Sequence, residues 1–280
     1  MKAWFITGVS RGLGLALAKA ALARGDTVVG TVRGAAPDLH AGPGALHVLK
    51  LDVTDGDAVV RVVEQAFGLA GGRLDVIVNN AGYGLLGAIE DATDEQAERL
   101  FATDVFGPFR LIRAALPRLR AQGFGHIINV TSVAGRAPGL ASGLYSAAKF
   151  ALEGLSASLI QEIAPLGLKV TAVAPGAFRT DFLSDHSIRL SSATSEAYVG
   201  TAGRAVDAFA VADGNQLGDP DRAAAAILKI ADAENPPLHL LLGSDALRRA
   251  EVKLAAVQSE IEAWKPLTLS TDFPAMDAVR

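Results

Sequence analysis

Hydrophobic residues gather along the chain in short β-branched runs, which alternate with longer Ala- and Leu-rich stretches of helical period as far as about residue 180. This alternation is typical of an α/β fold, in which a doubly wound, mostly parallel sheet is covered by helices on both faces. The pattern predicts seven strands, at residues 3–7, 27–31, 47–50, 76–79, 126–130, 169–174 and 239–242.

Helix boundaries are marked by capping and turn residues. Gly25 follows the first predicted helix, Thr93 with Gln96 resembles a capping box, and Asp219-Pro220 precedes a helix over residues 223–230. We find no second core and no low-complexity linker. The sequence therefore predicts one domain that comprises residues 1–280.

Two segments differ from this pattern. Residues 177–218 have weak periodicity and many Gly, Ser, Thr and Asp, and we expect a substrate lid there. Residues 245–280 form a C-terminal helical extension, which we expect to pack on its own domain because so few heptads do not argue for a coiled coil. Its apolar stripe consists of Leu247, Ala250, Leu254, Val257, Ile261 and Trp264.

Composition excludes several classes of function. The net charge of -4 gives no electrostatic footprint for nucleic acid, and no apolar run approaches the length of a membrane span. The chain has no Cys, which excludes thiol chemistry, and its five His have no helical ligand spacing, so we expect no metal site. The absence of Cys and of an apolar leader leads us to expect a cytoplasmic protein.

A glycine-rich turn follows the first predicted strand, in the sequence from Thr7 to Gly14. A strand, a glycine turn and a helix that follow one another aim backbone N–H groups at an anion. The alternative is a tight loop without a ligand, which its position after the first strand disfavours. The expected contacts to a cofactor phosphate are Gly8, Ser10, Arg11, Gly12, Leu13 and Gly14.

Two arginines indicate which dinucleotide is bound. Arg11 opposes the helix dipole by about 0.3–1 kcal/mol and therefore needs a compensating anion. Arg33 lies just beyond the second strand, where an NAD site would carry an acid for the ribose 2′-hydroxyl, and Val32 occupies that place. Two Arg and no acid predict a 2′-phosphate, and hence NADP(H), although either Arg alone could be a solvated surface charge.

Tyr145 and Lys149 lie four residues apart in a predicted helix and so share one face. Acid–base work by a phenol near neutral pH requires its pKa to fall by about three units, or roughly 4 kcal/mol. An ammonium about 4 Å away supplies about that much at an effective dielectric constant of 20. The spacing alone is common, and it gains meaning only together with other motifs.

Taken together, these motifs make the chain resemble a short-chain dehydrogenase/reductase, a family with a Rossmann-like fold. The turn at residues 7–14 matches the family's TGxxxGxG, residues 79–82 match NNAG, and residues 145–149 match YxxxK. Ser132 lies thirteen residues before the Tyr, and Pro175-Gly176 with Thr180 matches PGxxxT. The matches extend in the family's order from residue 7 to residue 180.

The resemblance implies a role for each matching residue. Tyr145 would exchange a proton with the substrate oxygen, Ser132 would hydrogen-bond the same oxygen, and Lys149 would hold the nicotinamide ribose and lower the pKa of Tyr145. Asp52 would lie near the adenine, Asn79 would line the cofactor cleft, and Thr180 would contact the carboxamide. Further cofactor contacts are expected at Val53, Ala81, Gly82, Pro175 and Gly176.

One position departs from the family. Where members usually have an Asn that organises a water relay to the Lys, this chain has Asp104. An anion there would stabilise the Lys149 ammonium and partly cancel its effect on Tyr145, so we expect Asp104 to belong to the catalytic group. The alternative is that Asp104 only replaces the hydrogen bonds of Asn.

The expected substrate is a hydrophobic ketone, aldehyde or alcohol, because apolar side chains such as Leu140, Phe178 and Phe182 should surround the nicotinamide beside Ser132 and Tyr145. His186 and Arg189 could meet a polar substituent or simply be solvated. Other hypotheses are an NADP(H)-binding regulator and an epimerase or dehydratase of the longer-chain group. The family resemblance further suggests a homodimer or homotetramer through helices over residues 105–122 and 145–164.

Overall fold

The computed structural model describes residues 1–40, 42–184, 187–193, 195–212 and 214–273. It confirms the α/β class and all seven predicted strands, four of them longer by one or two residues than the sequence pattern indicated. The strands are β1 (Ala3–Thr7), β2 (Thr27–Val32), β3 (Ala45–Lys50), β4 (Val76–Asn79), β6 (Gly125–Val130), β7 (Leu168–Pro175) and β9 (His239–Leu242).

The seven strands form one parallel sheet in the order β3-β2-β1-β4-β6-β7-β9. The chain starts with β1, the third strand in this order, continues outward through β2 to β3, and returns to β4 on the other side of β1. The carboxyl ends of β1 and β4 therefore lie where the winding reverses. In open α/β sheets this is where ligands bind.

Helices cover both faces of the sheet, because alternate residues of each buried strand point in opposite directions. Phe5 of β1 packs in a core with the helices on one face, whereas Trp4 and Ile6 pack in a core with the helices on the other. The first face carries α2 (Gly56–Leu69), α4 (Gly107–Gln122) and α5 (Gly143–Ile163), and the second carries α1 (Gly12–Ala23) and α7 (Pro220–Asp232).

Helix capping follows the sequence signals. Thr93 and Gln96 form both hydrogen bonds of a capping box at the start of α3 (Asp94–Phe101), as predicted. Asp219 caps α7, with Pro220 as the first helical residue, also as predicted. Asp55 accepts a hydrogen bond from the Ala58 N–H at the start of α2.

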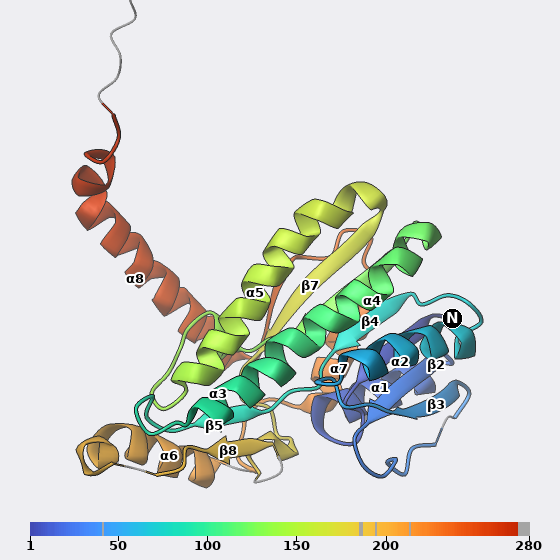
Figure 1. The fold of residues 1–280 in the computed structure, drawn as a ribbon, viewed down its shortest axis with the longest axis horizontal. Helices are drawn as coiled ribbons and strands as arrows, with labels where there is room; N and C mark the ends of the chain where they lie inside the picture. Colours follow the sequence, from blue (N-terminus) through green and yellow to red (C-terminus); the bar gives the residue numbers. More distant parts are fainter. Residues whose placement is uncertain (41, 185–186, 194, 213, 274–280) are drawn as a thin grey trace, which may run out of the picture.

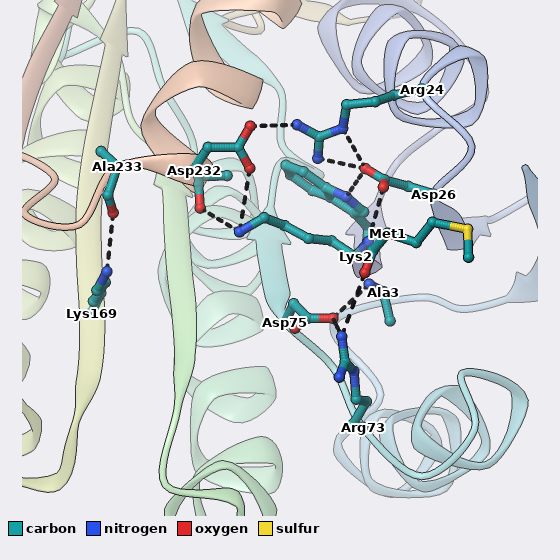
Figure 2. Close-up of polar contacts among 12 residues, drawn as sticks. Met1, Lys2, Ala3, Arg24, Asp26, Arg73, Asp75, Lys169, Asp232 and Ala233 are labelled. Atoms are coloured by element: carbon teal, nitrogen blue, oxygen red, sulfur yellow. Dashed lines mark hydrogen bonds and ion pairs between the residues drawn. The ribbon is translucent and has the colours of Figure 1, made fainter.

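A cluster of polar side chains surrounds the amino end of β1 (Figure 2). It lies at the end of the strands opposite to their carboxyl ends, where ligands bind. The buried Asp26 carboxylate accepts hydrogen bonds from the Lys2 N–H, the Trp4 indole and the Arg24 guanidinium. Burial raises the pKa of Asp26, but these hydrogen bonds outweigh it, so the pKa is lower than usual. Lys2 and Arg24 also pair with Asp232 at the end of α7, which links that helix to β1.

The segment after β7 contains structure that the sequence pattern did not predict. A strand β8 (Ile188–Leu190) pairs in parallel with β5 (Gly84–Leu86) as a separate two-stranded sheet, and α6 (Arg204–Ala212) follows. Three-residue strands are too short to show an alternating pattern. His186 lies outside the described residues.

The C-terminal helix α8 (Ser244–Leu269) extends away from the domain (Figure 1). The expectation that its apolar stripe packs on its own domain is wrong. Ala246 and Ala250 are buried near its start, but Leu254, Ile261 and Trp264 are 69%, 54% and 64% exposed. Neither α8 nor any other helix in the described part of the chain is both long and apolar enough to cross a membrane.

Candidate active site

A cleft of about 630 Å³ opens at the carboxyl ends of the central strands. It brings together segments that are distant in sequence, from the turn after β1 to the first turns of α8. The residues expected at the site that do line it are Gly8, Ser10, Arg11, Gly12, Leu13, Arg33, Asp52, Val53, Ala81, Gly82, Ser132, Tyr145, Lys149, Pro175, Gly176, Phe178, Thr180 and Phe182. Four others, Gly14, Asn79, Asp104 and Leu140, do not.

The glycine-rich turn is held by the segment after β4. The Asn80 amide donates hydrogen bonds to the carbonyl oxygens of Thr7 and Gly8, at 2.9 and 3.0 Å. The Thr7 hydroxyl accepts hydrogen bonds from the Asn80 and Ala81 N–H groups, both at 3.0 Å. Asn80 therefore fixes the turn, a role that the adjacent pair of Asn residues could have suggested from sequence.

Glycine is required in this turn for two different reasons. Gly8 and Gly12 have φ angles of +75° and +59°, which other residues rarely adopt. Gly14 is needed for packing, because a Cβ there would lie 2.3 Å from the Gly8 carbonyl oxygen and 2.4 Å from the Asn80 amide nitrogen. Its assignment as a cofactor contact is therefore corrected: Gly14 lets α1 approach the turn and does not line the cleft.

The start of α1 suits an anion. No side chain caps its first turn and no acidic residue lies there, in contrast to α2, α3 and α7. Uncapped N–H groups and the helix dipole together bind phosphate groups. The turn and the first residues of α1 are thus chemically suited to a dinucleotide phosphate.

The far end of the cleft carries the residues that would meet the adenosine. Val32 and Arg33 at the end of β2 and Asp52 after β3 all line it. Burial raises the pKa of Asp52, but hydrogen bonds from Thr54 and the positive charge of Arg33 outweigh it, so the pKa is low and Asp52 is ionised. Arg33 and Asp52 therefore act on each other electrostatically, and the charge of Arg33 is partly offset.

Asn79 lies in the sheet below the cleft, which corrects its assignment as a cofactor contact. It is buried, and its amide donates a 2.7 Å hydrogen bond to the Asn129 side chain. Asn129 in turn donates to the Ser156 hydroxyl at 2.8 Å. Asn79 therefore links β4 to β6 and α5, because the last residue of a strand still points into the packed layer.

Ser132, Tyr145 and Lys149 meet on one wall of the cleft. Ser132 follows β6 and is hydrogen-bonded to the Tyr145 hydroxyl. Lys149 lies one helical turn after Tyr145 on α5, with its ammonium 5.7 Å from the centre of the tyrosine ring and 3.2 Å from the Val130 carbonyl oxygen. The arrangement places a proton donor, a second hydroxyl and a positive charge together.

The pKa of Tyr145 is raised above its usual value, mainly by burial and further by the Asp104 carboxylate. The Lys149 ammonium and the hydrogen bond with Ser132 lower it, but by less. Lys149 therefore lowers the pKa of Tyr145, as expected. The expectation that this pKa lies below its usual value is wrong, because burial raises it by more. In this state the phenol is protonated at neutral pH.

Asp104 does not line the cleft. It lies in the protein interior and contacts Lys149 there. It lies in a π-helical turn (Ala102–Phe106) between α3 and α4, fully buried, with an oxygen 3.0 Å from the Lys149 nitrogen. The Tyr83 N–H donates to its other oxygen at 3.1 Å. Burial raises the pKa of Asp104. Burial lowers the pKa of Lys149, but the Asp104 carboxylate and Tyr145 together outweigh it, so the pKa is raised. The carboxylate thus helps to keep Lys149 protonated.

This contact predicts a change in pH dependence for Asp104→Asn. The Asp104 carboxylate raises the pKa of Tyr145, so its removal should lower that pKa and move the rising limb of the pH profile for alcohol oxidation to lower pH. Initial rates across pH would measure the shift. A limb that moves to higher pH would instead show that Lys149 loses its proton without the carboxylate.

Apolar side chains gather around Tyr145. Phe178 and Phe182 line the cleft, and the rings of Phe182 and Tyr145 have centroids 6.0 Å apart. Leu140 is 68% exposed and lies outside the cleft, so its assignment to the substrate is wrong. The loop after Ser132 turns this side chain to the surface.

Other residues line the cleft without having been expected from sequence. Ile188 and Phe209 come from the segment after β7, and Asp245 and Arg249 come from the first turns of α8. The Asp245 carboxylate accepts a 2.8 Å hydrogen bond from the Ala177 N–H. Only Asp245 had a sequence signal, since it closely follows the carboxyl end of a predicted strand.

Comparison with known proteins agrees with this geometry. Residues 2–189 match the family model for short chain dehydrogenases. Oxidoreductase BOA17 of Botryotinia fuckeliana is 37% identical, with 96% of this chain and 99% of that protein covered. A 3-ketodihydrosphingosine reductase of Bacteroides thetaiotaomicron is 36% identical, with 85% and 86% covered.

A solved structure shows the same agreement in three dimensions. The crystal structure of a short-chain dehydrogenase from Streptomyces avermitilis superimposes with a TM-score of 0.87 at 39% identity. The superposition covers 97% of this chain and all of the other. The fold, the cleft with its Ser, Tyr and Lys, and these matches lead to one conclusion: the chain belongs to the short-chain dehydrogenase family.

Proposed function

We propose that the protein is an NADP(H)-dependent oxidoreductase that interconverts a hydrophobic ketone or aldehyde and the corresponding alcohol. The observation that carries this proposal is the Tyr145 hydroxyl, hydrogen-bonded to Ser132 in the same cleft that the glycine-rich turn lines. The name of the Bacteroides relative describes the reduction of a ketone, which supports the reaction class. Phe178 and Phe182 support an apolar substrate.

The nicotinamide supplies a hydride to the carbonyl carbon in reduction and accepts one from the alcohol carbon in oxidation. Tyr145 donates its phenolic proton to the carbonyl oxygen in reduction and takes it back in oxidation. Ser132 donates a hydrogen bond to the same oxygen, where negative charge develops. Lys149 stabilises the phenolate that remains after the proton has left. The raised pKa of Tyr145 suits proton donation.

The proposal is tested by turnover. Purified protein is mixed with NADPH and a panel of apolar ketones and aldehydes, and oxidation of the cofactor is followed by its absorbance. A regulatory protein of the same fold would bind NADPH without turnover on any of them. The buried, charge-paired Lys149 and the hydrogen-bonded Ser132 and Tyr145 favour the enzyme.

Cofactor preference is a separate prediction. NADPH should bind at least about tenfold more tightly than NADH, because Arg11 and Arg33 line the cleft and Val32 stands where an NAD site has an acid. Asp52 offsets part of the charge of Arg33, so we expect a preference closer to tenfold than to a hundredfold. Calorimetry on both cofactors measures the ratio.

Variants test the origin of that preference. Arg33→Gln should weaken NADPH binding and leave NADH binding nearly unchanged. The matched control is Arg61→Gln, which removes an exposed positive charge from α2 outside the cleft. Equal dissociation constants for NADPH and NADH in the unmodified protein would contradict the prediction.

We also propose a lid and an oligomer. The segment over residues 177–218 supplies Phe182, Ile188 and Phe209 to the cleft, which supports a lid over an apolar substrate. Exposed Phe106, Phe109 and Phe150 at the start of α4 and on α5 support the homodimer or homotetramer that the family resemblance implies.

A further inference from the structure

Helix α8 is unusual because most of the side chains on its apolar face are exposed to solvent. It contains 26 residues, or about 39 Å of helix, and only Ala246 and Ala250 are buried among them. Most of the stability of a helix in a protein comes from packing of its apolar face. Leu254, Ile261 and Trp264 continue the face of Ala250 but extend beyond the domain.

The apolar positions of this helix follow a strict heptad. The spacing alternates between three and four residues, which is the pattern of two helices that pack along a common seam. The positions are Leu247, Ala250, Leu254, Val257, Ile261 and Trp264. A second helix with the same spacing, which every copy of this chain carries, would match this face.

The charges beside the seam fit such a partner. Lys253 and Glu260 are seven residues apart on the same flank, and neither forms an ion pair with a described residue of its own chain. In an antiparallel pair with Leu254 beside Val257, Lys253 of each copy lies near Glu260 of the other, so two attractive pairs form. A parallel pair would instead place Glu260 near Lys265.

The position of the domain selects between these two arrangements. Ala246 and Ala250 are buried at the start of α8, so the domain occupies that end of the helix. A parallel pair would set the two domains side by side at the same end of the paired helices, where both must fit around the start of α8. An antiparallel pair sets them at opposite ends.

We propose that α8 is a dimerisation arm, which pairs antiparallel with α8 of a second copy of the chain. In this register the pairing buries Leu254 and Val257 of both copies between the helices, and it sets Ile261 and Trp264 of each copy beside the start of the other copy's α8. This interface is distinct from the proposed one on α4 and α5, and it does not depend on the catalytic activity.

Cysteine cross-linking tests the arrangement, because the chain contains no Cys of its own. An equimolar mixture of the single variants Leu254→Cys and Val257→Cys should form a disulfide-linked dimer under mild oxidation at micromolar concentration. Leu254→Cys alone should not, since only a parallel pair brings the two copies of that position together. Ser259→Cys, on the opposite side of the helix, is the matched control.

Charge reversal provides a second readout by sedimentation. Lys253→Glu and Glu260→Lys should each weaken association through α8 by about tenfold, and an equimolar mixture of the two should associate more tightly than either alone. Both sites lie on α8 beyond its buried start, so unchanged unfolding transitions show that the domain is intact.

Each outcome decides the proposal. Linkage in the mixture of Leu254→Cys and Val257→Cys well above the rate of the Ser259→Cys control, together with restored association of the two charge variants, supports it. Linkage of Leu254→Cys alone would overturn the antiparallel pairing. A mixture of Leu254→Cys and Val257→Cys that links no faster than the control would show that a second copy does not cover this face, and would overturn the arm altogether.

Discussion

Replacement of Tyr145 by Phe is expected to lower turnover by about 10²–10⁴-fold while the dissociation constant for NADPH changes little. The substitution removes one oxygen from a ring that stays packed against Phe182. Turnover falls because the phenol is the group that gives a proton to the carbonyl oxygen. Steady-state rates with saturating NADPH, together with calorimetry of cofactor binding, measure the two effects separately.

A matched control exists in the same cleft. Tyr83 also lines it, and burial also raises the pKa of this residue, but it lacks the hydrogen bond with Ser132 that Tyr145 has. Tyr83→Phe should therefore retain most of the turnover. If Tyr145→Phe kept a tenth or more of the unmodified rate, the proton would have to come from elsewhere in the cleft.

The second large effect is expected on stability. Asp104→Ala should lower the free energy of unfolding by about 3–5 kcal/mol, because it leaves the buried Lys149 ammonium without its carboxylate. The Tyr83 N–H loses its acceptor at the same time. Urea denaturation at neutral pH, followed by tryptophan fluorescence, measures the loss.

Asp104→Asn separates charge from hydrogen bonding in this effect. Its amide oxygen still accepts from the Tyr83 N–H, so we expect a smaller loss of about 1–3 kcal/mol. Two variants of equal stability would mean that the hydrogen bond to the Tyr83 N–H contributes nothing measurable, so that the whole loss comes from the negative charge missing beside Lys149.

Much of the architecture could be predicted from the sequence, because it depends on short-range patterns. Each central strand is apolar on both faces, and capping residues such as Thr93 and Asp219 satisfy N–H groups only a few residues away. The glycine-rich turn, Ser132, Tyr145 and Lys149 also carried local spacing signals. The structure places all of them in one cleft.

The remaining features depend on where side chains point after distant segments have packed. The sequence does not show that the Asn79 side chain points into the protein whereas that of Asn80 points toward the glycine-rich turn. Nor does it show that Leu140 points away from the cleft. The sequence shows the apolar stripe of α8 but not what covers it. Likewise, the direct contact of Asp104 with Lys149 depends on the packing of the π-helical turn against α5.

The π-helical turn Ala102–Phe106 also limits which insertions and deletions the chain can tolerate in evolution. Helix α3, the five-residue turn Ala102–Phe106 and α4 follow one another without a break, and a π turn is an α-helix that holds one additional residue. Deletion of one residue there would restore regular α-helical geometry, so the residues of the turn would change their places on the helix surface and Asp104 would no longer face Lys149. Surface loops tolerate insertions and deletions in evolution, whereas in this helix a single codon separates a paired lysine from an unpaired one.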